Sequence, residues 1–241
     1  RAVDKSQTKT VQFLISKKAD VNIKNKDGVS ALYNAVAKKN LEIVKALINS
    51  GANPNEKNSE EGTLLMEVAK AESTGKDVKF TSELVKLLVA KGAELNAKNK
   101  SGISTLHFAV NRINYDLMLA LLSSGADVNI TDNNGFTVLK KAIMKFLSST
   151  NPKELEIIRK ILYLCVEKKT DLNAKDKSGK TILSDIAMNI SEGNKTQALE
   201  AARLAVNNGA NPDLKDNKDK SPLDYAEKKE IPELVSILKK Q

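Results

Sequence analysis

The sequence predicts an all-α fold, a solenoid of helix-turn-helix units linked by β-hairpin fingers. Three observations support this. A Ser or Thr that can open a helix recurs in steps of 33, 41, 33, 44 and 40 residues, at Ser30, Thr63, Ser104, Thr137, Thr181 and Ser221. A polar residue that closes each unit recurs with the same steps, at Asn22, Asn55, Asn96, Asn129, Asn173 and Asp213. The distance from a closing residue to the next opening residue is always 8. Periods of about 20 to 50 residues are typical of stacked repeats.

The stretch 27–55 shows the elements of one unit. Gly28 can take the positive φ of a tight turn, and Ser30 can cap the helix that follows. Two short helices then place apolar residues at three- and four-residue spacing, with Leu32, Ala35 and Val36 in the first and Val44, Leu47 and Ile48 in the second. Gly51 ends the second helix. Because helices this short are marginal alone in water, they need neighbouring units.

The second helix of each repeat, which we call the outer helix, carries three apolar residues at equivalent positions. The trios are Val11, Leu14 and Ile15; Val44, Leu47 and Ile48; Val85, Leu88 and Val89; Met118, Leu121 and Leu122; Leu162, Cys165 and Val166; and Ala202, Ala205 and Val206. In the last unit Lys239 follows Val235 and Leu238, so we expect a terminal unit that faces water. The sequence therefore predicts one repeat domain over 1–241, with a partial repeat at 1–26 and repeats that start near 27, 60, 101, 134, 178 and 218.

Extra residues in the second, fourth and fifth repeats number 8, 11 and 7. Seven or eight residues make about two helical turns, which would let each helix of a pair grow by one turn. In the fourth repeat an apolar face continues through Ile143, Phe146 and Leu147. The next residues predict an N-cap, a first-turn proline and a capping-box acid, at Asn151, Pro152 and Glu154. In the second repeat the stretch from about Ala71 to Thr81 contains Gly75, and we expect a loop there.

These residues resemble the ankyrin repeat family, from about Val11 to Leu238. The family's inner-helix motif T-P-L-H-x-A is matched by STLHFA at 104–109, and its closing motif by GADVN at 125–129. The stretches 51–55, 92–96 and 209–213 repeat the closing motif. The chain departs from the family at three glycine positions, where Lys169 replaces the helix-ending glycine and Glu61 and Asp219 replace the turn glycine. The local geometry is in question at these positions.

The formal charge of +9 comes from 35 lysines and only 4 arginines. Arginine is the residue suited to bidentate phosphate contacts, so a lysine-rich surface points first to solubility. The six fingers carry +1, −2, +2, −1, +2 and +1, which gives no continuous basic stripe. Nucleic acid is thus the less favoured partner. A lysine-mediated binder of nucleic acid or anionic surfaces, and an interaction segment of a larger multidomain protein, remain the alternatives.

The sequence favours neither an enzyme nor a metal site. His107 and Cys165 are the single histidine and cysteine, and they fall in an inner and an outer helix, respectively. We expect His107 to be a structural hydrogen-bonding residue and Cys165 to be a buried small apolar residue. A zinc site lacks ligands, and the acidic turn at 132–135 lacks the spacing of a calcium loop. No catalytic residue, cofactor or metal is predicted.

The resemblance implies a scaffold that binds a partner protein with the finger tips and the exposed side of the inner helices. The residue after the turn glycine is expected to be free, at Val29, Gly62, Ile103, Phe136, Lys180 and Lys220, and the residue after that to be buried. Apolar residues at two neighbouring fingers suggest the centre of an interface with a polar rim. The predicted partner-binding residues are Val29, Ile103, Phe136, Asn111, Arg112, Met144 and Lys145.

No apolar run approaches the roughly 18 residues of a membrane span, and no signal peptide is recognisable. The first residue is Arg1 rather than Met, so the earlier removal of a targeting segment stays open. We expect a soluble monomer, cytoplasmic or exported after loss of such a segment.

Overall fold

The protein is described here by a computed structural model that covers residues 2–3, 7–70 and 78–239. These residues are helical, and the chain divides into two compact units, 1–127 and 128–241. The first unit holds α1 (Thr8–Ser16), α2 (Ala31–Ala37), α3 (Leu41–Asn49), α4 (Leu64–Lys70), α5 (Val78–Ala90), α6 (Thr105–Asn111) and α7 (Tyr115–Ser123). The second holds α8 (Val138–Ser148), α9 (Pro152–Glu167), α10 (Ile182–Asn189), the 3₁₀ helix η1 (Glu192–Asn194), α11 (Lys195–Asn207), α12 (Pro222–Lys228) and α13 (Pro232–Leu238). The predicted single repeat domain stays a prediction.

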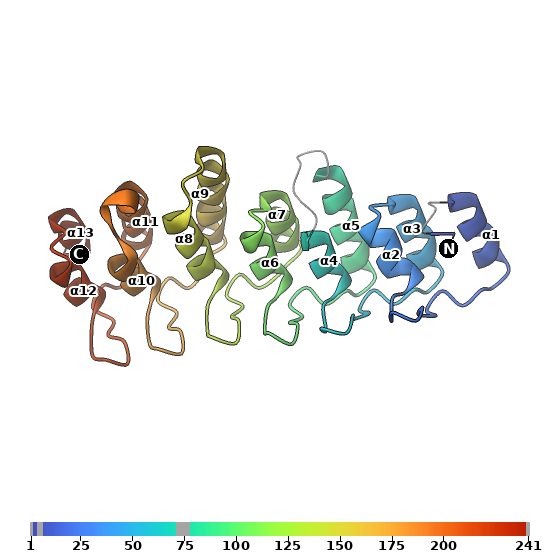
Figure 1. The fold of residues 1–241 in the computed structure, drawn as a ribbon, viewed down its shortest axis with the longest axis horizontal. Helices are drawn as coiled ribbons and strands as arrows, with labels where there is room; N and C mark the ends of the chain where they lie inside the picture. Colours follow the sequence, from blue (N-terminus) through green and yellow to red (C-terminus); the bar gives the residue numbers. More distant parts are fainter. Residues whose placement is uncertain (1, 4–6, 71–77, 240–241) are drawn as a thin grey trace. The chain divides into compact units, whose positions relative to one another are not determined.

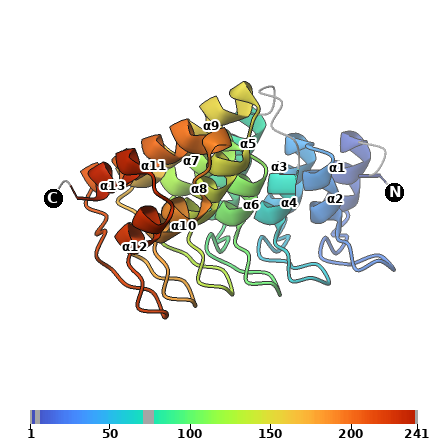
Figure 2. The same cartoon turned by 60° about the vertical axis from the view of Figure 1, so that its left-hand side comes forward.

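Each unit has two layers of helices (Figure 1). In the first unit the inner helices α2, α4 and α6 pack side by side, and the outer helices α1, α3, α5 and α7 form the second layer. In the second unit α8, α10 and α12 form the inner layer, and α9, α11 and α13 pack behind them. Within each unit the linking fingers extend from the edge next to the inner helices (Figure 2).

The outer-helix trios form much of the core, as predicted. The trios of α3 and α7 are fully buried, and Cys165 in α9 is inaccessible to solvent. Ile15, Val89, Val166 and Val206 are half-buried, and Leu14 in α1 is exposed, with 45% of its surface accessible. Lys239 is exposed after α13.

The closing residues connect successive repeats. The Asn22 side chain donates to the Gly51 carbonyl (3.1 Å) and accepts from the Asn53 N–H (2.9 Å), so it satisfies the end of the next outer helix. Asn55, Asn96, Asn129 and Asn173 accept from the backbone one repeat later in the same way. This contact explains why a polar residue recurs at the end of each repeat.

The insertion in the fourth repeat lengthens both helices, as predicted. Ile143, Phe146 and Leu147 are buried in α8, and Asn151 caps α9 by accepting from the Lys153 N–H at 3.0 Å. The prediction of a capping-box acid was wrong, because Glu154 accepts from the Ser149 hydroxyl (2.9 Å) instead.

The loop predicted in the second repeat was wrong at its end. Residues 78–81 belong to α5, where buried Thr81 extends the apolar face of Leu84, Val85 and Leu88 by one turn. The part of the predicted loop at 71–77 lies outside the described residues. The insertion in the fifth repeat forms η1 and the first turn of a 13-residue α11.

Candidate functional site

Each finger is held by one Asn or Asp side chain. In the first finger Asn25 Oδ1 accepts from the N–H groups of Asp27 (3.0 Å) and Val29 (2.9 Å). The same pair of bonds forms at the equivalent residues Asn58, Asn99, Asp132, Asp176 and Asp216. The six fingers therefore share one turn geometry.

The three positions that lack the family's glycine keep the left-handed backbone. The φ angles are 59° at Glu61, 58° at Asp219 and 57° at Lys169. The side-chain bonds of Asn58 and Asp216 hold the two turns in this conformation, although it is unfavourable for residues with a Cβ. The departures from glycine thus leave the finger geometry unchanged.

Neighbouring fingers within a unit are bonded through their backbones. In the first unit Lys100 N–H donates to the Glu60 carbonyl (3.2 Å). In the second, Lys177 N–H donates to the Asn134 carbonyl and Asn217 N–H to the Ser178 carbonyl, each at 3.0 Å. These bonds fix the spacing of the finger tips.

The expectation that the residue after the turn glycine stands free was wrong at most fingers. Val29, Ile103, Phe136 and Lys180 are half-buried, Gly62 is buried, and Lys220 is exposed. Phe136 is covered because the ammonium groups of Lys140 and Lys141 lie 5.0 and 5.2 Å from the centre of its ring. The following Ser or Thr caps each inner helix, and it is buried in the first five of the six repeats.

The remaining predicted partner-binding residues lie at the C-terminal end of α6 and in the C-terminal half of α8. In the first unit Asn111 and Arg112 are exposed at the end of α6, and Ile103 precedes the start of this helix, which is about 10 Å long at 1.5 Å per residue. In the second unit Met144 is 40% exposed and Lys145 is half-buried, about two turns after Phe136. Val29 lies before α2, in another finger of the first unit.

The second unit contains a buried cluster that we call the lysine latch, formed by Lys140, Asp176 and Asp185. Lys140 Nζ donates to Asp176 Oδ2 (2.9 Å) and to the Lys180 carbonyl (3.2 Å). Its distance to Asp185 Oδ2 is 2.5 Å, although among the described residues this oxygen has no hydrogen bond of suitable angle. The side chain of Lys140 is only 2% exposed. An inner helix is thereby joined to the next finger and to the next inner helix.

The first unit has an equivalent cluster, the tyrosine latch, formed by Tyr33, Asn58 and Glu67. The Tyr33 hydroxyl donates to the Glu67 carboxylate and accepts from Asn58 Nδ2 (3.3 Å). Tyr33 and Lys140 are both the third residue after the helix-opening Ser or Thr. Their partners also match, because Asn58 and Asp176 hold the next finger, and Glu67 and Asp185 are each the fourth residue after the next helix-opening Thr.

Two further contacts in the second unit each join an inner helix to the finger that precedes it. Lys141 Nζ lies 2.8 Å from Asp132 Oδ2, and the Tyr225 hydroxyl donates to Asp216 Oδ2 at 2.5 Å. This bond raises the pKa of Tyr225 to about 12. The carboxylates at the base of the fingers are therefore engaged by the inner helices.

The two aspartates of the lysine latch differ in their pKa. Burial raises the pKa of the Asp185 carboxyl, and the nearby Lys140 offsets only part of that effect. Burial would also raise the pKa of Asp176, but bonds from Lys140 and from the Lys180 and Ser178 N–H groups lower it below its usual range. Asp185 is therefore the carboxylate whose charge is costly in the folded state.

Comparison with known proteins identifies the repeat. A family model described as ankyrin repeats (3 copies) matches residues 1–80 and 76–162, which is more than half of the chain. The chain belongs to the ankyrin repeat family. Ankyrin repeats are general protein–protein interaction modules and a non-catalytic fold.

Relatives of this ankyrin chain include viral and bacterial proteins. It is 32% identical over 148 residues to an ankyrin repeat protein of Acanthamoeba polyphaga mimivirus, a match that spans 60% of the chain and 20% of the relative. It is 39% identical over 110 residues to one of Fowlpox virus, spanning 44% of the chain and 29% of the relative. The chain thus spans less than a third of the length of these two relatives.

Solved structures show the same fold. The ankyrin repeat domain of Bcl-3, a member of the IkappaB protein family, superposes with a TM-score of 0.77 at 21% identity, covering 98% of this chain and 95% of that one. The ankyrin repeat protein EF0377 superposes with a TM-score of 0.68 at 22% identity, covering 87% and 96%. At this identity the likeness shows the fold alone.

His107 and Cys165 have structural roles, as predicted. The ankyrin motif histidine His107 is fully buried and forms a capping box with Ser104, whose hydroxyl lies 2.8 Å from Nδ1. Burial raises the pKa of the Cys165 thiol to about 12, so the thiol is unreactive in the folded protein. Within the described residues no three His, Cys, Asp or Glu side chains gather in a way that could hold a metal ion. None of the described helices is long and apolar enough to cross a membrane.

Neither latch was predicted from the sequence. Lys140 and Tyr33 stand at the position of the motif histidine, in the same register as His107. This shared register was the signal from which the latches could have been predicted, because a residue at this position faces the next repeat. A lysine there is unusual since burial of its charge requires anionic partners.

Proposed function

We propose that this chain is a non-enzymatic scaffold that binds a partner protein through its fingers and inner helices. The observation that supports this most is the fixed geometry of the fingers. Each finger turn is bonded internally, and a latch joins neighbouring repeats in each unit. A surface that is already ordered loses little entropy when a partner binds, which favours affinity.

The binding residues of this proposal are those at the two ends of the inner helices. In the first unit they are Val29, Ile103, Asn111 and Arg112, and in the second Phe136, Met144 and Lys145. The exposed Arg112 and Met144 are residue types enriched at interfaces; Arg112 caps the C-terminus of inner helix α6, and Met144 lies in inner helix α8. We give Phe136 a smaller direct role than Met144, because two lysines cover part of its ring.

Site-specific photo-crosslinking in extract of the source organism tests the proposed surface. A photoreactive amino acid is placed singly at Arg112 and at Met144, and matched controls carry it at exposed apolar residues of the outer helices, Leu119 and Tyr163. We expect the same protein to be crosslinked from Arg112 and Met144 and not from the control positions. Crosslinking from the controls alone would remove the inner-helix surface as the binding site.

Substitution then tests the energetic role of the surface. Ile103→Asp combined with Met144→Asp is expected to abolish capture of that crosslinked protein and to leave the helical circular dichroism unchanged. Leu119→Asp combined with Tyr163→Asp introduces the same charge and should retain capture. Unchanged capture by the first variant contradicts the proposal.

A further inference from the structure

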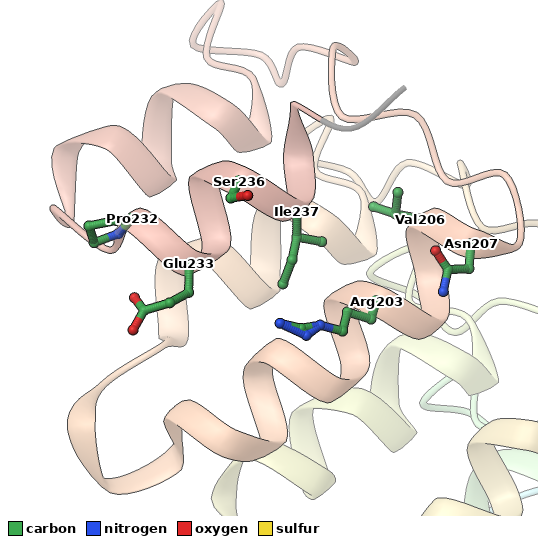
Figure 3. Close-up of a pocket in the computed structure, with 7 residues that line it drawn as sticks. All are labelled: Arg203, Val206, Asn207, Pro232, Glu233, Ser236 and Ile237. Atoms are coloured by element: carbon green, nitrogen blue, oxygen red, sulfur yellow. The ribbon is translucent and has the colours of Figure 1, made fainter.

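The outer helices α11 and α13 of the second unit border a groove with a volume of about 560 Å³. Its lining comprises Arg203, Val206 and Asn207 from α11 and Pro232, Glu233, Ser236 and Ile237 from α13. In Figure 3 the Arg203 side chain extends from α11 towards α13 and lies below Ile237, while the Glu233 carboxylate points outward. The groove is within the size range of sites that accept small ligands or short peptide segments.

Arg203 has no hydrogen-bond or ion-pair partner among the described residues. Its register makes this unexpected. In the first unit Gln12 and Lys45 have the same register as Arg203, each directly after the first residue of an outer-helix trio. Gln12 bonds to Glu42 (3.4 Å) and Lys45 pairs with Glu83 (3.0 Å), in each case on the next outer helix. The equivalent partner of Arg203 is Glu233.

Glu233 is occupied by another residue. Lys195 Nζ lies 2.9 Å from the Glu233 carboxylate, and this contact lowers the pKa of Glu233. Lys195 is the first residue of α11, which has 13 residues where α3 has 9. The insertion in the fifth repeat therefore supplies the cation that neutralises Glu233 and leaves Arg203 available. The other arginine of this unit, Arg159, is engaged by two bonds to Glu200 (2.5 and 3.0 Å).

The chemistry of the groove combines one cation with polar and apolar groups. The guanidinium can form two parallel bonds with a carboxylate. The side chains of Asn207 and Ser236 are exposed and supply further polar groups, and neither has a partner among the described residues. Half-buried Val206 and the exposed edge of Ile237, which is 8% accessible, add apolar surface beside them. Space is left because Ser236 is small at a position where other outer helices carry Lys45, Leu119 or Tyr163.

We propose that this groove binds an acidic peptide segment of a partner protein, with Arg203 pairing with a carboxylate and an adjacent apolar side chain packing on Val206 and Ile237. Charge complementarity favours this occupant, since Glu233 is already neutralised by Lys195 and the chain as a whole carries +9. The surface is distinct from the fingers and inner helices. It can therefore be tested independently of the function proposed above.

The test is a titration of ¹⁵N-labelled protein with acetyl-Ile-Glu-Leu-Glu-amide, followed by NMR. The matched probe is acetyl-Ile-Gln-Leu-Gln-amide, which has the same shape without charge. We expect the acidic peptide to shift the resonances of Arg203, Asn207, Ser236 and Ile237, and to bind at least tenfold more tightly than the amide peptide. Equal binding of the two peptides, or shifts confined to other residues, would overturn the proposal.

Variants identify the group that recognises the carboxylate. Arg203→Ala should weaken the acidic peptide about tenfold or more, the loss expected for a charge-assisted bidentate pair. Arg203→Lys keeps the charge but loses the planar fork, and should give an intermediate loss. Lys86→Ala removes the same charge from an exposed outer-helix position of the first unit and should bind as the wild type does. A wild-type affinity in Arg203→Ala contradicts the assignment, as would inorganic phosphate that reproduces the shifts at equal affinity.

Discussion

The two units join neighbouring repeats at the same three positions but with different chemistry. In the first unit the Tyr33 hydroxyl lies between an amide and a carboxylate, and both Tyr33 and Glu67 remain partly accessible to water. In the second unit Lys140 lies between two aspartates, with its side chain almost fully buried. A buried charge must be paired because its loss of hydration is costly. The ankyrin register therefore fixes the positions at which neighbouring repeats are bonded. The residue types at these positions decide how much stability is lost when one partner is removed.

The largest expected effect follows from removal of the cation of the lysine latch. Lys140→Met keeps the chain length of the side chain but leaves Asp176 and Asp185 as uncompensated buried carboxylates. We expect the free energy of unfolding of the second unit to fall by about 3–5 kcal/mol at neutral pH. Urea unfolding measures the loss.

The reactivity of Cys165 provides a second measurement of the stability of Lys140→Met, because this residue is buried in the second unit and is the only cysteine of the chain. Its labelling by a thiol reagent under native conditions should become faster in Lys140→Met. A labelling rate and an unfolding midpoint equal to those of the wild type would show that the latch contributes little to stability.

A smaller effect is expected from the tyrosine latch. Tyr33→Phe removes the hydroxyl but retains the ring, and water can reach the half-buried Glu67. The expected loss of unfolding free energy is about 1 kcal/mol, the net contribution of an ordinary hydrogen bond. A loss as large as that of Lys140→Met would mean that the two latches do not differ in the way we describe.

The third prediction concerns pH and the raised pKa of Asp185. A carboxyl whose folded pKa exceeds its unfolded pKa stabilises the protein in its protonated form, and this contribution is lost as pH rises through the folded pKa. Asp185→Asn should therefore raise the unfolding midpoint at neutral pH, and the gain should disappear below the unfolded pKa of an aspartate, about 3.9. Asp176 has a lowered pKa, so its contribution is instead lost as pH falls.

The matched control for this pH dependence is Asp176→Asn. It should destabilise the protein at neutral pH, because it removes the negative charge that is bonded to buried Lys140. The two N–H bonds can be kept, since an Asn side chain accepts the same pair of bonds in the first finger. Midpoints of thermal unfolding measured between pH 3 and pH 8 check both variants. If Asp185→Asn and Asp176→Asn behaved alike at neutral pH, the difference between the two carboxylates would be disproved.

The sequence was sufficient for the repeat register, because apolar spacing and helix caps are local features. Val44, Leu47 and Ile48 predicted a buried face, and Asn151 with Pro152 predicted the start of α9. Contacts between repeats were not predictable in the same way, since the partners of Lys140 are 36 and 45 residues away. The half-burial of Phe136 was missed for a similar reason. Its cover comes from two lysine side chains that a sequence pattern places in solvent.

Exchange of the latch chemistry tests most directly whether the two clusters are equivalent. In the triple variant Lys140→Tyr, Asp176→Asn and Asp185→Glu, the second unit carries the residues of the tyrosine latch at the same three positions. Lys140→Tyr alone should be strongly destabilised, because it leaves both aspartates without their cation. We predict that the triple variant regains at least half of that loss in urea unfolding. A triple variant no more stable than Lys140→Tyr would contradict the equivalence of the two latches.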